Sequence, residues 1–214
     1  DEKKIEILHS GINCERFCYQ PRELKNGEAV KIFTVARLVE MKGVAYGIKA
    51  VAQLIKSGRK ICYKIAGDGA LREELERLIK ELGMENSIQL LGWKGHKELP
   101  GLMDDTHILL TPSVTAANGE QEGIPNVVKE AMAMGIPVVG TLHSGIPELV
   151  ENGVSGYLAP ERDSQMLAEC LAKLIDQSDR WPEIGKAGRQ KVELEFDMNK
   201  LNDKLVELYR SVAT

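Results

Sequence analysis

Two cations stand five residues apart just after an apolar, β-branched run at positions 30–35. Residues 36–43 read Ala-Arg-Leu-Val-Glu-Met-Lys-Gly. The two cations are Arg37 and Lys42, and Lys42 directly precedes Gly43. A guanidinium fork and an ammonium point charge together suit a phosphate or a diphosphate. Gly43 favours a tight turn that delivers Lys42. The alternative interpretation is that both cations are ordinary solvated side chains.

Two carboxylates bracket the expected start of a helix. Glu130 lies on a helix that we expect over 126–134, and Pro125 suits its first turn. On one continuous helix, Glu122 and Glu130 would point about 80° apart, but Gly123 and Pro125 place Glu122 in the loop, where it can fold over the helix start. The free N–H groups and positive end of a helix attract an anion, so this arrangement suits a polyhydroxylated, phosphate-bearing ligand. Alternatively, Glu122 only complements the helix dipole and Glu130 belongs to a solvated face.

Other motifs carry weaker signals. Gly67-Asp68-Gly69 supplies two glycines of the dinucleotide fingerprint, but Arg72 stands where the third would be; it permits close approach of the backbone between strand and helix, or marks a simple turn. Trp93 either stacks on a base or packs in the core. His143 is an isolated loop histidine, and we expect such a residue to be exposed. The sequence contains neither a nucleophile elbow nor a Walker-type phosphate loop, so the hydrolase and P-loop classes lack their residues.

Composition limits the remaining classes. The chain has 214 residues, of which 43% are hydrophobic and 28% charged, which is typical of a globular domain. Its 32 acidic and 28 basic residues give a net charge of −4, whereas nucleic-acid binders usually carry a basic excess. The four cysteines lack the spacing of a zinc site, and we expect them to be free thiols in a reducing compartment. No apolar run is long enough to span a membrane.

Short apolar runs alternate with amphipathic stretches along most of the chain. We expect strands at 30–35, 61–66, 88–91, 108–110, 137–139 and 156–158. We expect helices at 44–55, 70–82, 96–103, 126–134, 166–175, 181–194 and 201–212. This alternation predicts an α/β fold, a doubly wound, Rossmann-like parallel sheet of about six strands. Ligands bind at the carboxyl ends of such strands, and most of the motifs above directly follow a strand.

Taken together, the motifs resemble the C-terminal, donor-binding domain of the retaining glycosyltransferases of family 4, which have the GT-B architecture of two Rossmann-like domains. The E-x7-E block from Glu122 to Glu130, with its flanks, carries this resemblance most specifically. The surrounding stretch 113–148 looks like bacterial exopolysaccharide enzymes of the colanic-acid type. The wider resemblance runs from 31 to about 162, through 36–43, 66–69, 90–92 and 98–99.

The resemblance implies a role for each candidate residue. Arg37 and Lys42 would hold the donor diphosphate, Glu122 would contact donor-sugar hydroxyls, and Glu130 would contact the ribose. Together these implied roles make Arg37, Lys42 and Glu122 the candidate catalytic residues. The candidate nucleotide-binding residues are Gly67, Trp93, Gly123, Ile124, Asn126, Val127 and Glu130.

The implied reaction is the transfer of a hexose, with retention, from a UDP- or GDP-sugar to a saccharide or lipid-linked acceptor. It needs no metal and no cofactor, because the cations and the helix end meet the charge that grows on the leaving diphosphate. Two alternatives stay open: a non-catalytic module that binds nucleotide sugars, and a nicotinamide-dependent oxidoreductase domain, which the residue at position 72 disfavours.

The resemblance also implies a comparable N-terminal domain that this chain lacks. Residues 1–29 are expected to be the interdomain connection, 30–196 the nucleotide-sugar-binding domain, and 197–214 a helix that packs towards the absent domain. We therefore expect the chain to bind nucleotide weakly and to transfer nothing alone. The implied compartment is the cytoplasm, and peripheral contact of the full-length protein with the inner face of the membrane stays open.

Overall fold

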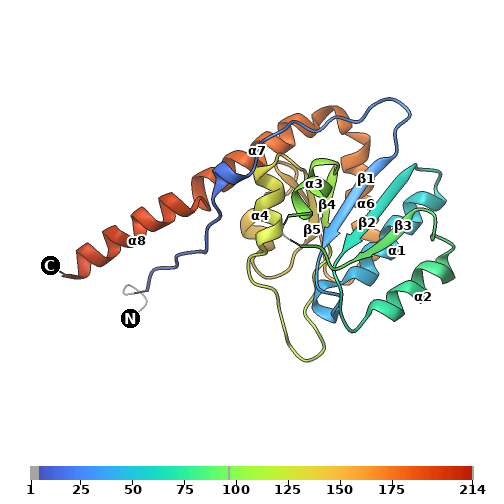
Figure 1. The fold of residues 1–214 in the computed structure, drawn as a ribbon, viewed down its shortest axis with the longest axis horizontal. Helices are drawn as coiled ribbons and strands as arrows, with labels where there is room; N and C mark the ends of the chain where they lie inside the picture. Colours follow the sequence, from blue (N-terminus) through green and yellow to red (C-terminus); the bar gives the residue numbers. More distant parts are fainter. Residues whose placement is uncertain (1–4, 96, 214) are drawn as a thin grey trace.

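The computed structural model describes residues 5–95 and 97–213, and its centre is one six-stranded sheet (Figure 1). All neighbouring strands are parallel, in the order β3-β2-β1-β4-β5-β6. The strands are β1 Val30–Val35, β2 Ile61–Ala66, β3 Ile88–Gly92, β4 Ile108–Thr111, β5 Val138–Thr141 and β6 Gly156–Ala159. The predicted doubly wound sheet is confirmed, with strand ends shifted by at most two residues.

The direction of winding reverses between β1 and β4. The chain first builds outwards from β1 to β3, and then returns to start β4 on the other side of β1. The loops that leave two such strands diverge, which opens a crevice at their carboxyl ends. The stretch with Arg37 and Lys42 follows β1, and the loop with Glu122 follows β4, so both flank this crevice.

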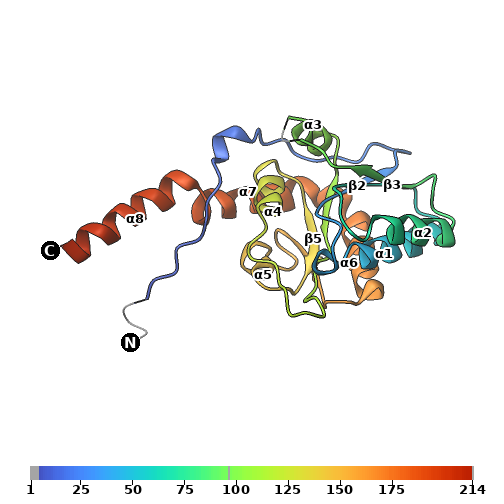
Figure 2. The same cartoon turned by 60° about the horizontal axis from the view of Figure 1, so that its bottom comes forward.

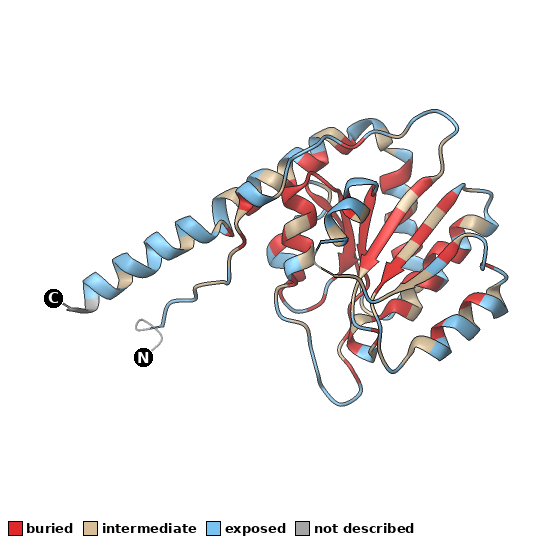
Figure 3. Cartoon of the chain, viewed as in Figure 1, coloured by how far each residue is buried: buried red, intermediate tan, exposed pale blue. Residues whose placement is uncertain are grey.

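Helices cover both faces of the sheet (Figure 2). One hydrophobic cluster joins the sheet to α1, α2 and α6, and a second joins it to α4 and α5. Ile32 and Phe33 pack in opposite clusters, because successive side chains of a strand point to opposite faces. The buried strands between the two layers are evident in Figure 3. The helices are α1 Val44–Lys56, α2 Arg72–Leu82, α3 Leu99–Asp104, α4 Asn126–Ala133, α5 Ile146–Leu149, α6 Ser164–Asp176, α7 Trp181–Glu195 and α8 Met198–Ala213.

Two helices differ clearly from prediction at their starts. The helix expected over 96–103 is α3, which begins three residues later; His96 lies outside the described residues. Pro100 is in the first turn of α3, where the missing N–H costs no hydrogen bond. α8 begins at Met198 instead of position 201, because the Asp197 side chain accepts two N–H groups of its first turn.

The amino-terminal segment and α8 leave the domain in the same direction (Figures 1 and 2). Lys204 of α8 pairs with Glu6 at 2.8 Å between Nζ and Oε1. Closer to the sheet, Ile12 forms a parallel bridge with the residue that precedes α8. The fully buried Lys129 of α4 donates to the carbonyl of Ser10 at 2.7 Å. The segment is therefore tied to both α4 and α8.

Candidate functional site

A cavity of about 300 Å³ opens at the carboxyl edge of the sheet, between the loops that follow β1, β2 and β3. Arg37, Lys42, Gly67 and Trp93 all line it, so the fold brings together four candidate residues from separate parts of the sequence. Trp93 is 73% exposed. It is therefore not a packed core aromatic, and its ring is available to stack on a ligand.

A smaller hollow adjoins this cavity and shares Val35, Ala36 and Lys42 with it. Its opposite wall comes from the loop after β4 and the start of α4, and includes Glu122 and Val127. Lys42 therefore stands at the boundary between the two hollows, and the carboxylate faces it from the β4 side.

The backbone after Lys42 explains how its side chain reaches this boundary. Lys42 is the last residue of a short 3-10 helix, and Gly43 follows it with a φ of 58°. This left-handed conformation favours glycine, so the predicted tight turn is confirmed. A Cβ on Gly43 would lie 1.9 Å from the carbonyl oxygen of Pro112. Glycine is therefore also required because the loop after β1 lies directly against the loop after β4.

Gly67 allows a second close approach of loops. Its φ is 143°, and a Cβ would lie 1.8 Å from the carbonyl oxygen of Ala36. The predicted close approach of the backbone is present, but it joins the loops after β1 and β2 instead of a strand and a helix. Arg72 begins α2 and pairs with Glu76 at 3.0 Å between Nε and Oε1, so a charged side chain occupies the position of the missing third glycine.

Lys42 and Glu122 form a direct ion pair inside the site. The ammonium donates to Oε2 of the carboxylate, and the side chains are only 16% and 13% exposed. The hydroxyl of Ser113 lies 3.4 Å from the same oxygen. The resemblance of the sequence implies separate roles for these two residues, whereas the structure joins them in one ion pair. Because an ammonium has three donor positions, the pair leaves Lys42 able to donate to a further anion.

Glu130 lies in a different hollow from Glu122. This third hollow, of about 500 Å³, has Arg16 and Glu130 among its lining residues and shares Leu99 with the first cavity. Glu130 is half-buried on α4. The two carboxylates therefore line different hollows and do not converge on one point.

The start of α4 is open towards the crevice. Pro125 is its N-cap, and within the described part of the chain no side chain caps this end. The carbonyl of Pro125 accepts the N–H of Val128 at 3.2 Å. Gly123 and Asn126 are exposed, and Ile124 packs partly against the second hydrophobic cluster. An uncapped helix start beside a cationic cavity is suited to bind an anion.

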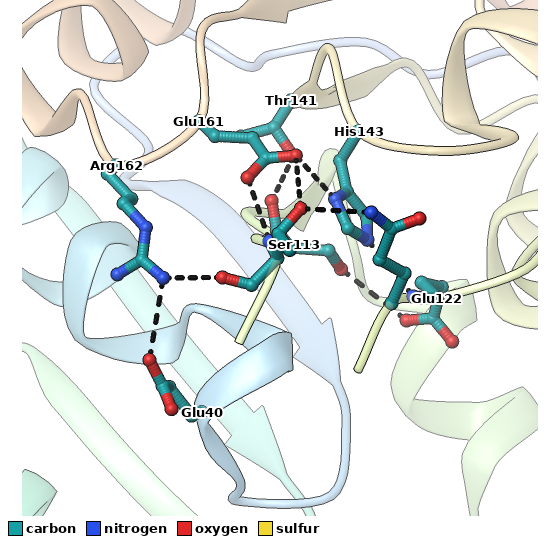
Figure 4. A network of polar contacts seen from close by, with 9 residues as sticks. Glu40, Ser113, Glu122, Thr141, His143, Glu161 and Arg162 are labelled. Carbon is teal, nitrogen blue, oxygen red and sulfur yellow. Dashed lines mark hydrogen bonds and ion pairs between the residues drawn. The ribbon is translucent and has the colours of Figure 1, made fainter. Parts of the chain in front are cut away.

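The expectation that His143 is an exposed loop histidine is wrong. The residue is completely buried. Its Nε2 accepts the backbone N–H of Glu122 at 3.0 Å, and its Nδ1 lies 2.6 Å from Oε1 of Glu161 (Figure 4). Sequence reasoning missed Glu161 altogether. The available signal was topological: the loops after β5 and β6 are neighbours because these strands pair.

Glu161 is held as a carboxylate by the loop after β4. It accepts the N–H of Thr115 at 2.7 Å and the hydroxyl of the same residue at 3.2 Å. Burial raises the pKa of Glu161, but the hydrogen bonds from Thr115 and His143 outweigh it, and the net shift is downward. The carboxylate therefore stays ionised at neutral pH and can accept all of these hydrogen bonds.

Among residues 5–95 and 97–213, no group of three or more His, Cys, Asp or Glu side chains is arranged to hold a metal ion. In the same ranges, no helix combines the length and apolar character needed to cross a bilayer.

The site and fold together define a known class. The family model described as "Glycosyl transferases group 1" matches residues 17–191. The chain therefore belongs to the group 1 glycosyltransferases, and the resemblance to a glycosyltransferase domain is confirmed.

Particular relatives narrow this class. The chain is 40% identical over 212 residues to WcaL of Escherichia coli, named as a colanic acid biosynthesis glycosyltransferase. It is 39% identical over 211 residues to AmsK of Erwinia amylovora, named as an amylovoran biosynthesis glycosyltransferase. These matches cover 98% and 99% of the chain but 52% of each relative, so the chain spans about half the length of these curated relatives. The likeness to exopolysaccharide enzymes is confirmed.

A solved structure supports the same assignment. Anabaena Alr3699/HepE in complex with UDP superposes with a TM-score of 0.83 at 26% identity, over 96% of this chain and 57% of that one. A glycosyltransferase from Rickettsia africae superposes with a TM-score of 0.85 at 22% identity, over 100% of this chain and 59% of that one, and shows the shared fold.

Proposed function

We propose that this chain is the donor-binding half of a retaining glycosyltransferase that transfers a hexose from a UDP- or GDP-sugar to a saccharide or lipid-linked acceptor. The strongest support is the cationic cavity at the carboxyl end of β1, which Arg37 and Lys42 both line, and the ion pair that joins Lys42 to Glu122. The HepE structures, described as complexes with UDP and with UDP-glucose, support a nucleotide sugar as the ligand.

The three hollows suggest where each part of the donor binds. We assign the base to the cavity with Gly67 and Trp93, and the diphosphate to the boundary at Lys42. The ribose then turns past Leu99 towards Glu130, in the hollow that shares this leucine. The donor sugar lies against Glu122, whose carboxylate accepts hydroxyl hydrogen bonds.

Catalysis by this half consists of stabilising the leaving group. Negative charge grows on the diphosphate as the anomeric bond breaks, and preplaced positive groups lower the energy of that state. Arg37 and Lys42 supply two such groups. The uncapped start of α4 supplies backbone groups from Gly123, Ile124, Asn126 and Val127. No step in this mechanism requires a metal ion.

The remainder of the enzyme would be a second domain that binds the acceptor. We propose that residues 1–29 connect to it, that 30–196 form the donor domain, and that 197–214 pack against it. Large apolar side chains on the amino-terminal segment and α8 are exposed, as expected of a surface that a partner covers: Ile5, Ile7, Leu205, Val206 and Tyr209. The whole enzyme is proposed to act in the cytoplasm, where a lipid-linked acceptor would bring it to the inner face of the membrane.

Titration of the 214-residue chain with UDP and with GDP tests the donor site. We expect one of them to shift the NMR signals of Arg37, Lys42 and Glu130, and Arg37→Ala to weaken binding. Arg59→Ala is a matched control, because Arg59 pairs with Asp176 and precedes β2, at the opposite edge of the sheet. Unperturbed spectra at millimolar UDP and GDP would contradict the proposal.

The two alternatives predict other outcomes. A non-catalytic module would bind nucleotide but show no transfer with any donor when the protein is extended to its full length. An oxidoreductase domain would bind NADH tightly and enhance its fluorescence.

A further inference from the structure

Two side chains outside the donor pocket join both ends of the loop that carries Glu122. Glu161, after β6, accepts the N–H and the hydroxyl of Thr115. His143, after β5, contacts Glu161 through Nδ1 and accepts the N–H of Glu122 through Nε2. Thr115 and Glu122 are thereby linked by two side chains, in an arrangement that we call the loop bridge. Figure 4 labels three of its members, Glu122, His143 and Glu161.

The hydrogen bonds of the loop bridge fix one tautomer of His143. A backbone N–H can only donate, so Nε2 must accept and carries no proton. The proton of the neutral ring is then on Nδ1, which donates to the carboxylate of Glu161. Because His143 is completely buried, no solvent replaces either hydrogen bond, and a residue that cannot accept at this point leaves the N–H of Glu122 unpaired.

The backbone on both sides of this pair is strained. Ser144 directly follows His143 with a φ of 45°, and Arg162 directly follows Glu161 with a φ of 61°. Non-glycine residues persist in this region when the surrounding contacts over-determine them, and such strain concentrates at functional sites. Arg162 also donates to the carbonyl of Thr115, which adds a further contact at the same loop end.

We propose that His143 and Glu161 are positioning residues that fix the backbone of Glu122, so that its carboxylate faces the donor sugar while it remains paired with Lys42. This inference rests on the proposed function. A displacement of about 1 Å in a positioned group can cost about 100-fold in activity. Hydrogen bonds at both ends of the loop therefore favour activity, because they keep the carboxylate of Glu122 in one position.

Two substitutions of His143 separate the two halves of the bridge. Glutamine extends as far as Nε2 and offers an oxygen to the N–H of Glu122, but it gives up the donor at Nδ1. Asparagine reaches only as far as Nδ1 and keeps a donor for Glu161, but it leaves the N–H of Glu122 without an acceptor. A purely structural role predicts that both variants behave alike, whereas positioning of Glu122 predicts that they differ.

The measured quantity is the affinity of the 214-residue chain for a nucleotide sugar relative to the free nucleotide. The probes are UDP-glucose against UDP and GDP-mannose against GDP, measured by calorimetry with variants that keep the native spectrum. We expect His143→Asn and Glu122→Gln each to lower this ratio about tenfold or more, the two losses not to add, and His143→Gln to retain most of the ratio. Glu161→Leu removes the acceptor of both Thr115 and Nδ1 of His143 and should lower the ratio in the same direction as His143→Asn.

His107 provides the control for loss of a buried histidine. It is 8% exposed, and its Nδ1 accepts the N–H of Lys31 at 3.1 Å, but it precedes β4 at the opposite edge of the sheet. His107→Asn should lower the melting temperature and leave the affinity ratio unchanged.

The possible failures are distinguishable. If the wild-type chain binds neither nucleotide, the proposed function fails and the inference fails with it. If nucleotide binds but the sugar adds no affinity in the wild-type chain, the role of Glu122 is wrong and so is that of the bridge. If the ratio is unchanged in His143→Asn, or equally reduced in His143→Gln, only the inference is overturned.

Discussion

Lys42→Met removes one charge of the ion pair with Glu122 in the proposed donor site and keeps most of the side-chain volume. The carboxylate of Glu122, only 13% exposed, then keeps the 3.4 Å contact with Ser113 but loses its cationic partner. Breaking a fully buried pair costs about 3–5 kcal/mol. Because both side chains keep some exposure to solvent, 16% and 13%, we expect a smaller loss, of about 1–3 kcal/mol.

The double variant Lys42→Met/Glu122→Gln removes both charges and should recover much of this stability. The four proteins of this cycle can be compared by urea denaturation at pH 7, and the interaction energy should lie between about 0.5 and 3 kcal/mol. Additive effects would show that the two side chains do not depend on each other, and would contradict the ion pair as the reason for their placement.

The same variants separate the two roles in binding. Loss of a charge-assisted hydrogen bond to the diphosphate is worth about 1.5–3 kcal/mol, so Lys42→Met should weaken UDP or GDP binding by about 10- to 150-fold. Glu122→Gln removes a negative charge beside the diphosphate and should leave nucleotide affinity equal or higher. If Glu122→Gln weakened binding of the free nucleotide as much as Lys42→Met does, the assignment of Glu122 to the sugar would be refuted.

Three further predictions concern single residues. Burial, with a hydrogen bond to Asp197, raises the pKa of the Cys14 thiol from 9.0 to about 11. The free energy of unfolding should therefore hold below pH 9 and fall as the pH rises towards 11. Urea denaturation of Cys14→Ala at a series of pH values should lack this fall. Burial lowers the pKa of His107 below 6.5, so the free energy of unfolding should decrease as the pH falls below 6.5. In His107→Gln, the free energy of unfolding should depend less on pH in this range. Trp93→Ala should weaken nucleotide binding by about 2- to 10-fold, with an unfolding free energy within about 0.5 kcal/mol of the wild type because the ring is exposed; a calorimetric titration and a urea curve check both.

The elements of the fold were predictable because their signals are local. A β-branched run such as 30–35 can be buried on both sides only as a central strand of a covered sheet. The turn at Gly43 and the helix start after Pro125 likewise depend on residues within a few positions of each other. These signals were enough to predict the sheet and the crevice, and four of the residues that line the main cavity were candidates from the sequence: Arg37, Lys42, Gly67 and Trp93.

The interior of the site was not predictable in the same way. The Lys42–Glu122 pair joins residues 80 positions apart, and the contact of His143 with Glu122 spans 21. The burial of His143 depends on the pairing of β5 with β6, which brings Glu161 to its side. No local pattern reports such a contact, so a residue that looks like an ordinary exposed histidine is at the centre of the polar network.

The contacts between loops follow the order of the strands along the carboxyl edge. The loop after β2 packs on that after β1 at Gly67, and the loop after β1 packs on that after β4 at Gly43. The loops after β4, β5 and β6 are then joined through His143. Each wall of the proposed donor site is thus supported from within this chain, and we expect the site to be formed before a ligand arrives.

A site that is formed before its ligand arrives need not bind that ligand with high affinity. The cavity and its adjoining hollow contain three cations, Arg37, Lys42 and Lys94, and two carboxylates, Asp68 and Glu122. Their net positive charge is small for a ligand that carries a diphosphate, and the cavity is open to water, which screens the attraction. We therefore expect weak nucleotide binding by this half alone, and a gain in affinity when a second domain closes the cleft and excludes water. Tighter binding of UDP or GDP by the extended protein than by this chain, at equal ionic strength, would support that reasoning, and equal affinity would contradict it.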